Sequence, residues 1–165
     1  MKKISILLMS VLMVVTVLVT GCSNETKSAS SKTYDIEALY EAVEKVNPVT
    51  DARELDDFAL ENDFKLNMAD VKAYKGKISG ALSDSALILV VEANEGKGSA
   101  IKESLEAYKE NQKVYFGNYA EFADAEAMVN DGRVVTNGDY VIIVFANVNG
   151  VTYNEIDKAI SEAMN

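Results

Sequence analysis

Cys22, the only cysteine of the chain, restricts the fold more than any other residue because it divides the sequence into two unlike parts. It ends the segment Val19-Thr20-Gly21-Cys22, which follows two N-terminal lysines and an uncharged apolar run over residues 4–19. A basic start, an apolar run and small residues before the cleavage point are typical of a secretory signal peptide. The ending is a lipobox, the pattern at which bacterial lipoprotein signal peptidases cut before a diacylglyceryl-modified cysteine. We therefore predict a signal peptide over residues 1–21, recognised through Val19, Thr20 and Gly21, and a lipid anchor on Cys22.

A transmembrane helix that ends in a free thiol is the alternative interpretation of this segment. Such a span needs about 20 predominantly apolar residues, and a basic flank is expected after it, whereas Ser23, Asn24 and Glu25 follow here. The pattern favours lipidation, which predicts a location at the cell membrane, on its extracytoplasmic face. Because Cys22 is the only cysteine, no intramolecular disulfide can form and the core alone must hold the fold.

The predicted mature protein is strongly acidic. Removal of residues 1–21 takes away two lysines and no acids, so the formal net charge changes from −10 to −12, with 14 basic against 26 acidic side chains. A domain with this charge has no basic stripe for phosphates, so no nucleic-acid partner is predicted. An anionic bilayer would repel the domain, so membrane attachment depends on the two acyl chains of the diacylglyceryl anchor.

A serine-rich polar stretch separates the predicted anchor from the rest of the chain. Residues 22–33 contain the lipidated cysteine and this tether, and the eleven residues after Cys22 span roughly 18 Å as a flexible chain. Residues 34–165 have the length of one domain. The sequence therefore predicts one folded domain held close to the bilayer.

Two hairpin-and-helix units dominate the pattern of the folded part and predict an α+β domain around an antiparallel sheet of four strands. Asn137-Gly138 is the strongest hairpin signal and predicts a type I′ turn. Thr152 with Glu155 predicts a capping box, and Ser99 is the predicted N-cap of the helix after the first hairpin. The expected strands cover residues 75–81, 86–93, 133–136 and 139–147, and the stretches 87–91 and 141–145 are expected to be central because they are apolar on both faces.

Additional helices are predicted from apolar spacing. One covers residues 34–46, with Thr33 as N-cap, and stops at Asn47-Pro48 because the residue before proline is disfavoured in the α region. A second begins after Thr50 or Asp51. Two further helices are expected over residues 67–74, with Asn67 as cap, and over residues 119–129.

The two ββα units overlay at a constant offset of 55 residues, which pairs Ile88 with Ile143 and Asn94 with Asn149. An internal duplication explains this overlay, and so does the chance alignment of two units with similar loop lengths. The identity between the units is too low to separate these alternatives.

The order of lipobox, serine-rich tether and helix resembles an uncharacterised lipoprotein family of anaerobic Gram-positive bacteria, catalogued as a domain of unknown function. Residues 64–71 (FKLNMADV), 78–81 (ISGA) and 137–144 (NGDYVIIV) are similar to turns, caps and strands of that family. The resemblance covers about residues 34–165 and implies no catalytic residue. Phe64-Lys65 departs from the aromatic-glycine pair that is more usual in the family.

The residue types available for catalysis are limited because the chain contains no histidine. Serine–histidine and cysteine–histidine nucleophile systems and histidine-ligated metal sites are therefore excluded, and no cofactor is predicted. The sharpest acidic cluster is Asp56-Asp57 with Glu61 and Asp63, which suggests acid–base hydrolysis of glycans. A solvated helix face explains the same cluster.

Three loops have the composition of ion-binding sites. Gly96-Lys97-Gly98-Ser99 lacks the first glycine and the spacing of a phosphate-binding loop, so a flexible turn before a helix is the favoured interpretation. Asn130-Asp131-Gly132 and Asn137-Gly138-Asp139 do not fit the spacing of a twelve-residue calcium loop, and turns explain both.

Tyr115, Phe116 and Tyr119 surround a glycine at an expected helix–helix junction. They form either an exposed contact patch or the packed end of a helix. Taken with the anchor and the short tether, they favour a non-enzymatic module that binds an envelope protein or ligand. The alternative is a carboxylate-dependent hydrolase that acts on cell-wall glycans.

Overall fold

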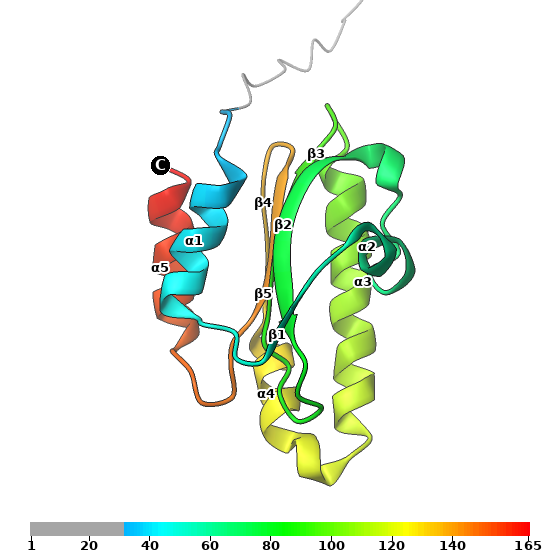
Figure 1. Cartoon of the computed structure of the whole chain (residues 1–165), viewed down its shortest axis with the longest axis vertical. Coiled ribbons are helices and arrows are strands. Elements are labelled where there is room, and N and C mark those ends of the chain that lie inside the picture. The colour runs from blue at the N-terminus through cyan, green and yellow to red at the C-terminus, as the bar shows by residue number, and fades with distance from the viewer. Residues whose placement is uncertain (1–31) are drawn as a thin grey trace, which may run out of the picture.

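A computed structural model describes residues 32–165, which form an antiparallel sheet with helices on both faces (Figure 1). The sheet has five strands in the order β1-β2-β3-β5-β4, so the α+β class is confirmed and the predicted count of four is one too low. The strands are β1 (Ala52–Glu54), β2 (Val71–Ser79), β3 (Leu87–Ala93), β4 (Arg133–Asn137) and β5 (Tyr140–Phe145).

The helices form one layer on each side of the sheet (Figure 1). The first layer contains α1 and α5, which pack on each other, and the second contains α2, α3 and α4. Their bounds are α1 (Ile36–Val46), α2 (Asp57–Asn62), α3 (Gly98–Gly117), α4 (Ala123–Asp131) and α5 (Tyr153–Ala163), with 3₁₀ turns η1 (Met68–Asp70) and η2 (Ala120–Phe122).

The central strands β3 and β5 are buried on both faces, as their apolar sequences predict. Leu89 lies opposite Ile143 and packs into the core beneath α3, while Ile88 lies opposite Val144 and packs beneath α1 and α5. All four side chains are fully buried. Because side chains alternate between the faces of a strand, one pair of strands supplies two separate cores.

The two ββα units differ in hand. β2, β3 and α3 place the helix on one face of the sheet, whereas β4, β5 and α5 place it on the other. A rotation that superposes the two hairpins would therefore put α5 on the wrong face. The offset of 55 residues also pairs Ile88 with Ile143, which point into different cores. The structure therefore does not support an internal duplication at this offset.

Strand pairing takes over the start of one predicted helix and the end of another. Residues 52–54 pair with β2 as an edge strand, and the helix expected there begins only at Asp57, capped by Asp56. Residues 71–74, expected to be helical, pair with β3 as the start of β2. Asn67 caps η1 as predicted, accepting a hydrogen bond from the backbone N–H of Ala69. Short amphipathic segments suit either structure, and pairing with a neighbouring strand, β2 for residues 52–54 and β3 for residues 71–74, decides between them.

The helix starts were predicted with mixed success. Thr152 and Glu155 form the predicted capping box of α5. Asp35, not Thr33, caps α1. Ser99 is not an N-cap, because α3 already begins at Gly98.

The hairpin between β4 and β5 does not use a type I′ turn. Gly138 has a φ of +62° and Asn137 is part of β4, so the two loop residues are Gly138 and Asp139. A positive φ at the first loop position alone is the pattern of a type II′ turn, which favours glycine there. The predicted hairpin is confirmed and the turn type is corrected.

The N-terminal and C-terminal ends of the described chain lie side by side, at the top of Figure 1. The Lys32 ammonium donates to the carbonyl oxygen of Asn165 at 2.6 Å, and Asn137 donates to the Tyr34 hydroxyl at 2.7 Å. Val19, Thr20, Gly21, Cys22 and most of the predicted tether lie outside the described residues. Within residues 32–165, no helix has the length and apolar character needed to cross a bilayer.

Candidate binding surface

Tyr115, Phe116 and Tyr119 lie where α3 ends and η2 begins, as the sequence predicts. The two tyrosines are about half exposed (44% and 48%), whereas Phe116 is buried at 6%. Tyr115 and Tyr119 can therefore contact a partner, while Phe116 belongs to the core beneath α3. Two of the three predicted residues are thus exposed at this junction, and Phe116 is buried.

The exposed tyrosines are held by an aromatic cluster. The Tyr115 and Phe116 ring centroids are 5.0 Å apart, and Phe122 lies 5.6 Å from Tyr119 and 5.9 Å from Phe116. Edge-to-face pairs at these separations stabilise the ring positions. The two tyrosines are therefore fixed in position before any partner binds.

Leu82 extends the apolar surface from the loop between β2 and β3. It is 75% exposed, and this loop lies at the same end of the molecule as the end of α3 and η2 (Figure 1). Sequence reasoning missed Leu82 because the apolar residue of a turn carries no periodic signal. A groove of about 130 Å³ runs between this loop and α3; it is lined by Leu82, Tyr108, Tyr115, Phe116 and neighbouring residues.

Buried polar contacts fix the loop that carries Leu82. The Asp84 carboxylate accepts from the backbone N–H of Ala86 at 3.1 Å, and the Ser85 hydroxyl donates to the carbonyl oxygen of Ala125 at 3.1 Å. The second bond ties the loop to α4. The groove is therefore built from elements of both the sheet and the helical layer, and we refer to Leu82, Tyr115 and Tyr119 together as the aromatic face.

The acidic residues proposed for hydrolysis do not converge on one cavity. Asp56 accepts from the backbone N–H of Ala59 at 2.8 Å, and Asp57 accepts from the Tyr74 hydroxyl at 2.6 Å. Burial and this hydrogen bond raise the pKa of Tyr74 to about 12. Among the four predicted acids, only Asp63 lines any of the cavities described here. Two of the carboxylates therefore serve α2 and its contact with β2.

The N-terminus of α3 is already paired with a carboxylate of the protein. Asp139, at the tip of the β4–β5 hairpin, accepts from the backbone N–H of Gly98 at 3.2 Å. Lys97 forms an ion pair with Asp70 at 3.0 Å. The Lys97 ammonium and the Gly98 N–H of this loop are therefore both engaged by internal contacts. In the described part of the chain, no group of three acidic side chains is arranged to hold a metal ion.

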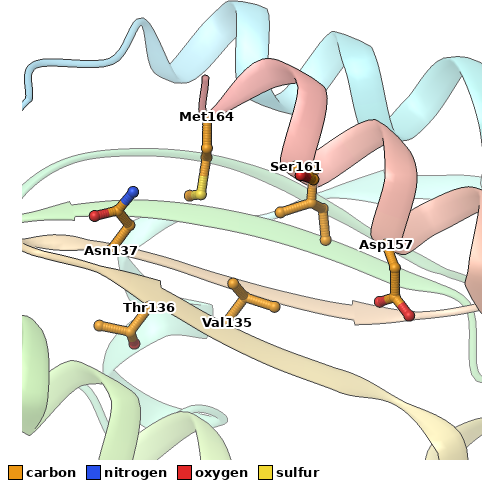
Figure 2. Close-up of a pocket in the computed structure, with 7 residues that line it drawn as sticks. Val135, Thr136, Asn137, Asp157, Ser161 and Met164 are labelled. Atoms are coloured by element: carbon orange, nitrogen blue, oxygen red, sulfur yellow. The ribbon is translucent and has the colours of Figure 1, made fainter.

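A cavity of about 290 Å³ lies between β4 and α5 (Figure 2). Met164 and Asn137 mark one end and Asp157 marks the other. Asp157 accepts two bonds from Arg133, at 2.8 and 3.1 Å, and Asn137 is engaged by Tyr34. Because these polar groups are satisfied, the remaining lining is mainly apolar and does not specify a ligand.

Comparison with known proteins places most of the described domain in one family. A family model described as a domain of unknown function, DUF4358, matches residues 45–146, which run from the end of α1 through β5. No curated protein matches the chain. No solved structure matches it either.

Proposed function

The chain belongs to the DUF4358 family, a domain of unknown function, and from this premise we propose that it is a lipid-anchored, non-enzymatic binding module on the extracytoplasmic face of the cell membrane. The observation that carries the proposal is the aromatic face. Leu82, Tyr115 and Tyr119 are apolar or aromatic side chains, each more than two-fifths exposed, beside a groove. Exposed aromatic side chains in fixed positions are enriched at protein interfaces.

The position of the aromatic face supports this proposal. It lies on elements at the bottom of Figure 1, opposite the end where the chain enters at Lys32. An anchor on Cys22 would hold the domain by that entry end, ten residues before Lys32. The aromatic face would then point away from the bilayer, toward components of the envelope. No observation in the described residues favours the alternative of a glycan hydrolase.

The binding role is tested by removing the aromatic face. Cells that produce the full-length chain are crosslinked, and proteins captured with it are quantified by mass spectrometry. We expect the variant Leu82→Ser/Tyr115→Ser to capture about tenfold less of the partner than the wild type does. The reason is that each interface anchor contributes about 1 kcal/mol or more to binding. Phe58→Ser is the matched control, since Phe58 is 71% exposed on α2, away from the groove.

Equal capture by wild type and both variants would contradict a partner at the aromatic face. The anchor is tested separately by mass spectrometry of the N-terminal peptide. That peptide should begin at Cys22 and carry a diacylglyceryl mass, and Cys22→Ser should abolish both cleavage and modification. An unmodified N-terminal segment in the wild type would overturn the anchoring half of the proposal.

A further inference from the structure

A second cavity opens on the other side of Tyr108 from the groove of the aromatic face. It lies between the loop after α2 and the middle of α3 and has a volume of about 260 Å³. Tyr108 lines both this cavity and the groove, so the two hollows share one wall along α3. The cavity lining consists of Asp63, Phe64, Lys65, Glu103, Ser104, Ala107, Tyr108 and Asn111.

Tyr108 is buried but its hydroxyl has no hydrogen-bond partner within residues 32–165. The residue is only 7% exposed, and its ring stacks on Phe64 with centroids 4.1 Å apart. Within the same residues, every side-chain nitrogen or oxygen that is sealed from solvent has a partner. The unpartnered hydroxyl is therefore not sealed from solvent, and Tyr108 lines two hollows. A polar group at such a position is available to a ligand.

Tyr108 and Asp63 both line the second cavity. Burial raises the pKa of Tyr108, and the Asp63 carboxylate raises it further, while the Arg53 guanidinium opposes this. Asp63 lines the second cavity and does not line the groove. The hydroxyl is therefore within electrostatic reach of the carboxylate that lines the second cavity.

The charges around the cavity favour a cation. Two carboxylates, Asp63 and Glu103, line it against the single ammonium group of Lys65. Arg53 approaches Asp63 only to 4.0 Å, and both side chains are half exposed, so this ion pair is weak and open to competition. The excess of 26 acidic over 16 basic side chains in the whole chain adds a long-range attraction for cations.

We propose that this cavity binds the cationic group of a lysine or arginine side chain of the protein that docks on the aromatic face. The Tyr108 hydroxyl accepts a hydrogen bond from the cation, and Asp63 and Glu103 balance its charge. The inference rests on the proposed function, because the shared wall at Tyr108 lets one extended segment fill both hollows. This segment carries a basic side chain, followed by apolar side chains that reach Leu82 and Tyr115.

The cavity is tested without the partner, using small molecules that carry the cationic group expected of the partner. n-Butylamine and n-butylguanidine are titrated into the full-length chain in zwitterionic detergent, and backbone amide shifts are followed by NMR. n-Butanol serves as the neutral probe and n-butyrate as the anionic probe. We expect saturable shifts over residues 103–111 with the two cations only.

Three variants assign the contacts. Tyr108→Phe keeps the ring stack and should weaken cation binding about tenfold, the loss typical of a hydrogen bond to a charged group. Asp63→Asn/Glu103→Gln should abolish the saturable shifts. Glu106→Gln, on the same helix but outside this cavity, should bind as the wild type does.

Equal shifts with n-butanol, or unchanged cation binding in Asp63→Asn/Glu103→Gln, would overturn the cation site. This failure is separable from failure of the proposed function. The crosslinking experiment depends on Leu82 and Tyr115, neither of which lines the cation cavity. Conversely, the amine titration requires no partner.

Discussion

Replacement of Asn47 by alanine is expected to lower the free energy of unfolding by about 3 kcal/mol. Asn47 is fully buried at the end of α1. Its side-chain amide donates to the carbonyl oxygen of Phe145 at 3.1 Å, and its side-chain oxygen accepts from the backbone N–H of Asn147 at 3.0 Å. Alanine removes both bonds and leaves two polar backbone groups without this partner, each at a cost of about 1–3 kcal/mol.

Urea unfolding of the full-length chain in detergent, followed by circular dichroism, measures this loss as a lower midpoint at an unchanged slope. Asn62→Ala is the matched control, because the Asn62 side chain makes one bond, to the carbonyl oxygen of Phe58, at an exposed position. We expect that control to change stability by less than about 0.5 kcal/mol. An equal effect of the two substitutions would show that the buried bridge is not needed for stability.

Replacement of Gly98 by alanine is the second large effect that we expect, at about 3 kcal/mol. A methyl group at this position would overlap the carbonyl oxygen of Gly138 and lie 3.1 Å from the Asp139 Cα atom. The hairpin tip must then move away from α3, which also strains the bond from the Gly98 N–H to Asp139. Overpacking against backbone is costly because no side-chain rotamer can relieve it.

Ser99→Ala tests the same helix start without steric overlap. Ser99 is exposed, and Lys97, the N-cap residue of α3, makes no capping hydrogen bond through its own side chain. In thermal unfolding, the midpoint temperature of Ser99→Ala should therefore be close to that of the wild type, and the midpoint temperature of Gly98→Ala should be well below it. A loss of about 1 kcal/mol on Ser99→Ala would restore the predicted serine cap and contradict the role of Asp139.

Local signals predicted the central part of the fold correctly. The apolar stretches that became β3 and β5 and the capping box at Thr152 depend on neighbouring residues, and they appear as predicted. The β1 strand did not follow from the sequence, because Arg53 and its neighbours are exposed and become a strand only through pairing with β2. The cap of α3 comes from Asp139, 41 positions along the chain from Gly98. No local pattern contains such a contact.

The aromatic face was predictable in part. The aromatic residues around Gly117 indicated a junction with a contact patch, and the structure places that junction at an exposed end of α3. Leu82 joins them only because the sheet brings its loop beside α3. The burial of Phe116 follows from the turn of the helix toward the sheet, which sequence spacing alone did not resolve.

The apolar character of β3 and β5 on both faces leaves their alignment poorly determined by hydrophobicity. If β3 slid by one residue, one apolar set would replace another, so the usual penalty for a slipped pairing would be small. Polar residues at the ends of the two strands supply this penalty instead. Glu92 accepts from the Tyr140 hydroxyl at 2.9 Å, and a slip would turn this carboxylate into the core beneath α3. At the opposite end, Asn47 recognises Phe145 and Asn147. The bond between Glu92 and Tyr140 thus helps to select one pairing of β3 with β5, and the Asn47 bonds hold the end of β5 against α1.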